Sequence, residues 1–131
     1  MRDRREAARE MLIQKEARAE RELEELLRAA WEDFERTVAL IVKEYDPQEI
    51  WQWGSLLYPE TFSRGSDIDI GVLGLSVRDH MKLLRVTEGT TSLPLHIARL
   101  EEMDPRYVEH IRTYGRRVYP DGCGRQAAFS D

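Results

Sequence analysis

The chain has 131 residues, of which 41% are hydrophobic, so it can bury one modest core but hardly two. Its net charge of -5, with 34% charged residues of both signs, argues against a general basic surface for nucleic acid. A single cysteine, Cys123, excludes an internal disulfide, and the sequence shows neither an apolar run of ~18 residues nor a signal peptide, which predicts a soluble, cytoplasmic protein with no membrane partner.

The first predicted element is a long N-terminal helix. Apolar residues recur every three or four positions from Leu23 to Tyr45, which is the spacing of a helix stripe that docks on a core. Asp46-Pro47 ends this helix, because proline disfavours helix in the residue before it. Residues 1–22 are rich in Arg and Glu and have a poor burying face. They are either frayed or a helical extension whose partner lies on another chain.

A short apolar strand over residues 50–53 is predicted next, and the turn Gly54-Ser55 follows it directly. A glycine-serine turn allows backbone N–H groups and a hydroxyl to approach an anion closely. A helix that started there would add a favourable dipole for the anion. The flanking Trp51 and Trp53 are interpreted as core residues.

The pair Asp67 and Asp69 opens the second predicted strand. Alternate side chains of a strand share a face, so both carboxylates project together while Ile68, Ile70 and Val72 project into the opposite layer. Neighbouring carboxylates repel each other, and a hard divalent cation relieves that repulsion. Because Mg²⁺ is commonly held by one or two carboxylates and by substrate phosphates, the pair predicts a magnesium site.

Three more elements are predicted downstream. They are a short helix that Ser76 caps and Gly89 ends, a strand over residues 93–98, and a helix that Asp104-Pro105 starts and that ends near Gly115. The inner stripe of the last helix comprises Val108, Ile111 and either Tyr114 or Gly115.

The arginines around the end of the last helix, at positions 112, 116 and 117, are interpreted as solvated residues that complement its C-terminal dipole. The chain is therefore divided into a helical arm and docking helix over residues 1–46, a core over 47–120, and a loosely held tail over 121–131.

The Gly54-Ser55 turn, its spacing to Asp67 and the Asp-x-Asp strand together resemble the signature of the nucleotidyltransferase superfamily, most of all its minimal, single-domain branch. The resemblance runs over about residues 50–119. It implies an α+β fold, a mixed β-sheet flanked by helices, here with a long N-terminal helix. It also assigns catalysis and metal binding to Asp67 and Asp69, and nucleotide binding to Gly54, Ser55 and Ser66. A solvated acidic strand, the alternative, explains neither the spacing nor the apolar flanks.

The family's third carboxylate, on the strand before the last helix, is not found here. Strand alternation places His96 at that position, either in the site as a catalytic residue or as an ordinary strand-face histidine. A neutral imidazole can accept a proton, but it adds no negative charge to a two-magnesium site. Glu101 and Glu102 are interpreted as solvated, and Asp104 as a helix cap, rather than as the missing ligand.

A second departure follows the Gly-Ser turn. Many members of the family have an Arg or Lys there that reaches phosphates, whereas this chain has Leu56 and Leu57. Arg64 is the candidate substitute for nucleotide binding. Its alternative is a solvent-exposed loop arginine.

Two functions remain open. The first is a magnesium-dependent nucleotidyltransferase that moves a nucleoside monophosphate, AMP from ATP by default, onto a hydroxyl of a protein, an RNA or a small molecule. For this first function, the resemblance implies that the protein is the antitoxin of a toxin-antitoxin pair and acts beside a small helical partner protein of the HEPN class. The second is a catalytically weakened module of the same fold that binds nucleotide or a helical partner. In either case the N-terminal helix would bind the partner or form a homo-oligomer.

Overall fold

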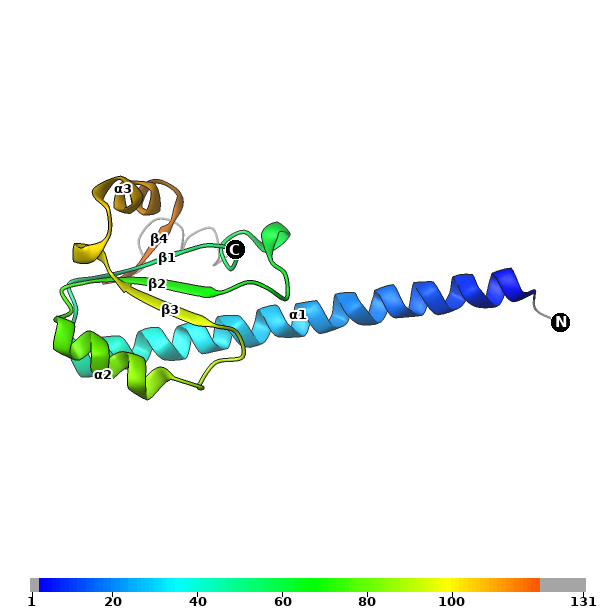
Figure 1. The fold of residues 1–131 in the computed structure, drawn as a ribbon, viewed down its shortest axis with the longest axis horizontal. Coiled ribbons are helices and arrows are strands. Elements are labelled where there is room, and N and C mark those ends of the chain that lie inside the picture. Colours follow the sequence, from blue (N-terminus) through cyan, green and yellow to red (C-terminus); the bar gives the residue numbers. More distant parts are fainter. Residues whose placement is uncertain (1–2, 121–131) are drawn as a thin grey trace.

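A computed structural model describes residues 3–120 as four strands, three α-helices and two short 3₁₀ helices (Figure 1). In chain order the elements are α1 (Arg4–Tyr45), β1 (Glu49–Trp53), η1 (Pro59–Thr61), β2 (Ile68–Leu73), α2 (Val77–Thr87), β3 (Leu95–Arg99), η2 (Leu100–Glu102), α3 (Pro105–Tyr114) and β4 (Arg116–Tyr119). The tail assigned to residues 121–131, with Cys123, lies outside the described residues. None of the helices within residues 3–120 combines the length and apolar character that a membrane span requires.

The strands form one mixed sheet in the order β3-β2-β1-β4. Strand β1 is antiparallel to β2 and to β4, whereas β2 and β3 are parallel. Figure 1 shows α1 and α2 on one face of this sheet and α3 on the other. The predicted α+β fold, a mixed sheet flanked by helices with a long N-terminal helix, is confirmed.

Helix α1 is a continuous helix of 42 residues, which at 1.5 Å per residue is about 63 Å long. Asp3 caps its start by accepting a hydrogen bond from the Arg5 N–H, and Asp46, with a positive φ of 45°, ends it before Pro47. The predicted apolar stripe docks on the sheet through Ala30, Phe34 and Ile41. From Arg4 to Glu22 the chain is helical rather than frayed, and this part extends past the sheet (Figure 1).

The core lies between the sheet and helices α1 and α2. Ile68, Ile70 and Val72 of β2 are fully buried there, as the alternation of this strand predicts, and Leu83 of α2 packs against the same cluster. The alternate residue Asp69 therefore projects from the opposite face. The face that carries the aspartate is thus set by the burial of the isoleucines.

Ile70→Ala is expected to lower the free energy of unfolding by about 3 kcal/mol, because it removes buried methyl groups and leaves a cavity in the centre of the sheet. Chemical denaturation followed by circular dichroism measures the change. Val86→Ala on the exposed side of α2 is the control and should stay within about 0.5 kcal/mol of the parent. Equal losses in both variants would contradict the assigned core.

Both predicted helix caps are confirmed. The Ser76 hydroxyl accepts a hydrogen bond from the Asp79 N–H at 3.0 Å, and the Asp104 carboxylate accepts one from the Arg106 N–H at 2.8 Å. On α3, Ile111 is buried and Val108 is half-buried, as expected. Of the two alternatives for the end of the stripe, Gly115 is half-buried and Tyr114 is exposed.

Strand β4 is missing from the sequence-based prediction, which placed solvated arginines there. Arg116 and Arg117 are half-buried and pair with β1, and the Arg116 guanidinium lies over the Trp31 ring at 5.8 Å from its centroid. The interpretation of the two residues as solvated is therefore wrong. A four-residue strand with two arginines has too little apolar alternation to be found without its partner.

Asp33 of α1 fastens the loop between α2 and β3. Its carboxylate accepts hydrogen bonds from the Ser92 N–H at 2.8 Å and the Ser92 hydroxyl at 3.1 Å, and it pairs with Arg36. Burial raises the pKa of Asp33, but these bonds outweigh burial and hold its pKa below the usual value.

We expect Asp33→Ala to cost about 2 kcal/mol at pH 7, because the hydrogen bonds that the buried, charged carboxylate accepts from Ser92 and Arg36 are lost. Since the folded pKa is lowered, this contribution is complete above the unfolded pKa of about 3.9 and disappears as the pH falls through the folded value. Denaturation at pH 7 and at pH 3 should therefore show a smaller difference between variant and parent at pH 3. A constant difference would contradict the role of the ionised carboxylate.

Candidate functional site

The Gly54-Ser55 turn joins β1 to the rest of the site. It is closed by hydrogen bonds from the Leu57 N–H to the Gly54 carbonyl, 3.1 Å, and from the Tyr58 N–H to the Ser55 carbonyl, 3.2 Å. The chain turns here without starting an α-helix, so Gly54-Ser55 does not lie at the N-terminus of an α-helix. Leu56 and Leu57 are buried and anchor the turn in the core, which explains why apolar residues stand where a basic one was expected.

Gly54 is in direct contact with Asp69. Its φ is +93°, and a Cβ atom at this position would lie 2.5 Å from the Asp69 carboxylate oxygen Oδ2. Residue 54 must therefore be glycine for two reasons, the left-handed backbone and the missing space. The turn and the aspartate strand form one structural unit.

Asp67 and Asp69 differ in their environment. Asp67 is exposed and directly precedes β2, whereas the Asp69 side chain, within β2, is only 18% exposed. Burial raises the pKa of Asp69, His96 acts in the opposite direction, and the charge of Asp67 raises it further. A buried carboxylate beside a second carboxylate is stabilised when a cation binds to both.

His96 lies beside this pair, at the position that strand alternation assigns to it. The parallel pairing of β2 and β3 sets His96 opposite Asp69, and its Nδ1 lies 3.4 Å from Asp69 Oδ1. The His96 side chain is 62% exposed, and its imidazole is nearly perpendicular to the ring of Trp53, with 6.4 Å between centroids. One imidazole nitrogen thus faces the carboxylate, and the side chain remains open to solvent.

Ser66 and Arg64, which are also predicted to bind nucleotide, both form contacts within the chain. Ser66 is buried, and its hydroxyl accepts a hydrogen bond from the Ser63 N–H at 2.9 Å, so it shapes the loop before Asp67. Arg64 forms an ion pair with Glu22 of α1. In this arrangement Arg64 ties the loop to the long helix, and its assignment to phosphate binding stays a prediction.

A row of aromatic side chains next to the site was not predicted. From Trp53 it continues over α3 through Tyr107, His110 and Tyr114, with centroid separations of 6.5, 6.2 and 4.8 Å. Trp53 is half-buried and the α3 members are exposed. The spacing of three and four residues in α3 was a signal for a shared helix face, but only the sheet brings Trp53 to it.

The donor set fits one magnesium ion better than two. Asp67 and Asp69 offer oxygen ligands, and phosphate oxygens would complete the coordination of a single ion. Within residues 3–120 no group of three His, Cys, Asp or Glu side chains is arranged to hold a metal. Glu101 and Glu102 are exposed, as predicted; Glu101 accepts a hydrogen bond from the Gly74 N–H at 2.8 Å and Glu102 pairs with Arg99.

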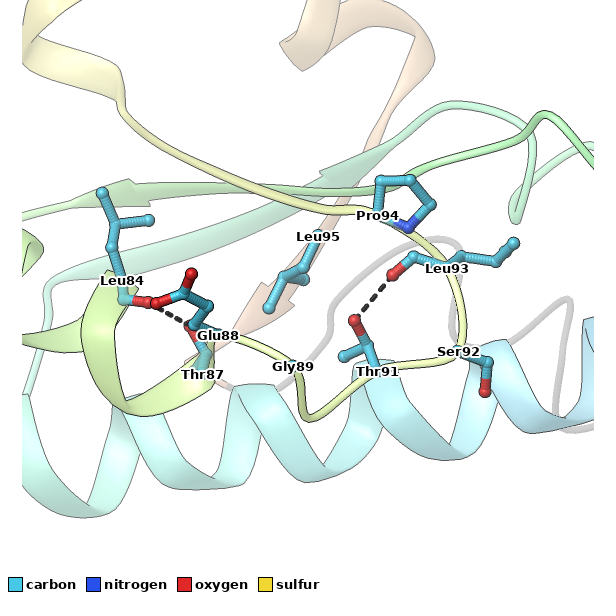
Figure 2. Close-up of a pocket in the computed structure, with 9 residues that line it drawn as sticks. All are labelled: Leu84, Thr87, Glu88, Gly89, Thr91, Ser92, Leu93, Pro94 and Leu95. Atoms are coloured by element: carbon cyan, nitrogen blue, oxygen red, sulfur yellow. Dashed lines mark hydrogen bonds between the residues drawn. The ribbon is translucent and has the colours of Figure 1, made fainter.

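A cavity of about 540 Å³ opens on the other side of β3, between the end of α2 and the loop that Asp33 fastens (Figure 2). Leu95 lines it, and because His96 is the next residue, its side chain projects from the opposite face. The hydroxyls of Thr87 and Thr91 already donate to backbone carbonyls, at 2.7 and 2.6 Å. With Glu88 as its charged side chain, this cavity does not favour a phosphate.

The fold is that of nucleotidyltransferase-like proteins. A chain in the crystal structure of a mutant toxin-antitoxin MntA-HpeT complex has a TM-score of 0.51 and 19% identity, over 72% of this chain and 77% of that chain. A chain in a toxin-antitoxin structure with AMP-PNP has a TM-score of 0.54 and 20% identity, over 72% and 78%. No protein-family model and no curated protein matches the sequence. At these identities the likeness establishes the fold alone.

Proposed function

We propose that the protein is a magnesium-dependent nucleotidyltransferase that moves a nucleoside monophosphate, AMP from ATP by default, onto a hydroxyl group. The observation that carries the proposal is the junction at Asp69, where the Gly54 turn, a second carboxylate and His96 meet at one end of the sheet. The similar toxin-antitoxin structures, one of them with AMP-PNP, support this fold as a scaffold for nucleotide binding.

In this mechanism Asp67 and Asp69 would hold one magnesium ion, which would neutralise phosphate charge. The Gly54-Ser55 turn allows the polyphosphate to approach the backbone because no side chain stands at residue 54. An acceptor hydroxyl attacks the α-phosphorus, a new P–O bond forms, and the bond to the bridging oxygen breaks so that pyrophosphate leaves. Asp69 fixes Nδ1 of His96, which leaves Nε2 to take the proton of the hydroxyl.

We further propose that the protein acts as the antitoxin of a toxin-antitoxin pair, with a small helical protein as partner. The two similar structures are toxin-antitoxin complexes, which supports a protein partner. A hydroxyl of that partner is the first acceptor to test, before RNA and small molecules. The exposed aromatic row on α3 adjoins the site and offers the partner a contact surface.

One observation favours a second function, a module of the same fold that binds nucleotide or a partner with little catalysis. His96 stands where the family pattern requires a third carboxylate, and an imidazole contributes no negative charge to a second magnesium ion. The two functions differ in one property. Both require magnesium-dependent nucleotide binding, but only the first transfers label to an acceptor.

Calorimetric titration with ATP, with and without Mg²⁺, followed by incubation with labelled ATP and candidate acceptors, separates the two. Under the first function His96→Ala reduces transfer by about 10² or more while ATP binding is retained, and Lys82→Ala on the exposed side of α2 is the control. Magnesium-dependent ATP binding without transfer of label to a validated acceptor would establish the second function. Absence of magnesium-dependent binding would refute both.

A further inference from the structure

Helix α2 exposes more large apolar side chains than it buries. Only Leu83 and Thr87 of this helix are buried. Four large apolar side chains are between 42 and 57% exposed, those of Val77, Met81, Leu84 and Val86. Single exposed apolar residues are common on protein surfaces, but Val77, Met81 and Leu84 follow one another at steps of four and three residues and form one stripe. The outer side of α2 therefore has the pattern of a helix that packs against another helix.

Two arginines lie beside this stripe. Arg78 and Arg85 are exposed and are three and four residues from Met81, so they are its neighbours on the helix surface. Within residues 3–120 neither of them forms an ion pair or a side-chain hydrogen bond. Arginines elsewhere in the fold do pair with carboxylates, namely Arg36, Arg64, Arg99, Arg106 and Arg112. With three basic residues and one acidic residue, α2 has a net charge of +2 in a chain of net charge -5.

We call the α2 face the surface formed by Val77, Arg78, Met81, Leu84 and Arg85. Lys82 follows Met81 in sequence, so it lies about 100° further round the helix, outside this face. The face ends at the cavity of about 540 Å³, because Leu84 also lines that cavity (Figure 2). A cavity at the end of an apolar stripe offers an anchor point for one apolar side chain of a partner.

We propose that the α2 face binds an acidic, amphipathic helix of a partner protein. Apolar residues of that helix pack on Val77 and Met81, one apolar side chain enters the cavity, and its carboxylates pair with Arg78 and Arg85. The two arginines are seven residues apart, which is about 10.5 Å along a helix, so they fit carboxylates about two turns apart on the partner. The face lies on the side of the sheet opposite to Asp69 (Figure 1), and the proposal does not depend on the proposed function.

A protein helix fits this face better than a lipid surface or RNA. An interfacial helix turns a broad apolar face towards the lipid and keeps its cations at the sides. Here Arg85 lies almost opposite the buried Leu83, at the outermost position of α2, where lipid would have to accept its charge. RNA binding relies on a field of positive charge, whereas this chain is acidic, and phosphates gain nothing from the side chains of Val77 and Met81.

The test uses a lactam-bridged helical peptide of about 15 residues, in which leucines recur at three- and four-residue steps and glutamates flank them. Titration into the ¹⁵N-labelled full chain, up to about 500 μM peptide, should shift the NMR signals of α2 and of the loop that lines the cavity, because an interface of this size binds weakly but measurably.

Arg78→Glu with Arg85→Glu should weaken peptide binding about tenfold or more, because attraction becomes repulsion. A peptide with lysine in place of glutamate should then bind this variant about tenfold more tightly than the glutamate peptide does. Met81→Ser should weaken binding without changing its dependence on salt. Lys15→Glu with Arg18→Glu, two exposed residues of α1, changes the net charge equally and should stay within about twofold of the parent.

Three results would each overturn the proposal. They are no shift of the α2 signals up to the highest peptide concentration, equal weakening by the α2 pair and the control pair, and failure of the lysine peptide to bind the reversed chain. Vesicles of phosphatidylserine with phosphatidylcholine and a short single-stranded RNA are titrated in parallel. Stronger shifts of α2 with either of them than with the peptide would assign the face to lipid or to RNA instead.

Two further measurements keep this test separate from that of the proposed function. Far-ultraviolet circular dichroism checks that each variant is folded. Magnesium-dependent ATP titration should be unchanged in the α2 variants, because the face and the Asp67/Asp69 pair lie on opposite sides of the sheet. Absence of ATP binding in a parent chain that binds the peptide would refute the proposed function alone.

Discussion

Replacement of both Asp67 and Asp69 by asparagine is expected to abolish magnesium-dependent nucleotide binding and to leave the free energy of unfolding unchanged or higher. The loss follows because neutral amides replace the two charged oxygen ligands of the ion. Burial raises the pKa of Asp69 in the folded state, with a further contribution from Asp67, so ionisation of Asp69 costs the folded protein stability above that pKa. Asparagine removes this cost.

The sign of the effect can be followed with pH. The pKa of Asp69 is raised in the folded state, above the unfolded value of about 3.9. The free energy of unfolding of the parent therefore rises as the pH falls from 7 through the folded pKa towards the unfolded one. The advantage of the double variant should therefore be largest at pH 7 and shrink in acid. Urea denaturation at pH 7 and in acid measures the change in the free energy of unfolding. Calorimetry with Mg²⁺ and ATP measures the loss of nucleotide binding. Asp104→Asn, which keeps a good helix cap, is the matched control. A strongly destabilised double variant would mean that the aspartates are structural.

Gly54→Ala is expected to affect both stability and nucleotide binding. The positive φ alone costs about 1–3 kcal/mol for a residue with a side chain. The new methyl group would also lie 2.5 Å from Asp69 Oδ2, so the carboxylate must move away from the turn. We expect magnesium-dependent ATP binding to fall at least tenfold, as measured by calorimetry.

Gly89→Ala separates the two causes. Gly89 also has a positive φ, +73°, but a Cβ there would meet no atom within 4 Å. It should therefore lose stability from backbone strain alone and keep nucleotide binding. If Gly54→Ala behaves like Gly89→Ala in both measurements, the contact between residue 54 and Asp69 has no part in the site.

Features that depend on local signals could be predicted from the sequence. The stripe from Leu23 to Tyr45 and the caps at Ser76 and Asp104 lie where they were predicted, because helix periodicity and capping act between residues a few positions apart. The alternation of β2 likewise predicted which face buries Ile70 and which presents Asp69. These signals need no knowledge of the rest of the chain.

Contacts between residues that are distant in sequence depend on the tertiary structure. Strand β4 exists because β1 offers it hydrogen bonds, and Arg116 is drawn from solvent by the ring of Trp31. The 3.4 Å approach of His96 to Asp69 and the pairing of Arg64 with Glu22 each join residues far apart in sequence. No local pattern encodes such contacts, because they arise from strand order and from the way helices cover the sheet.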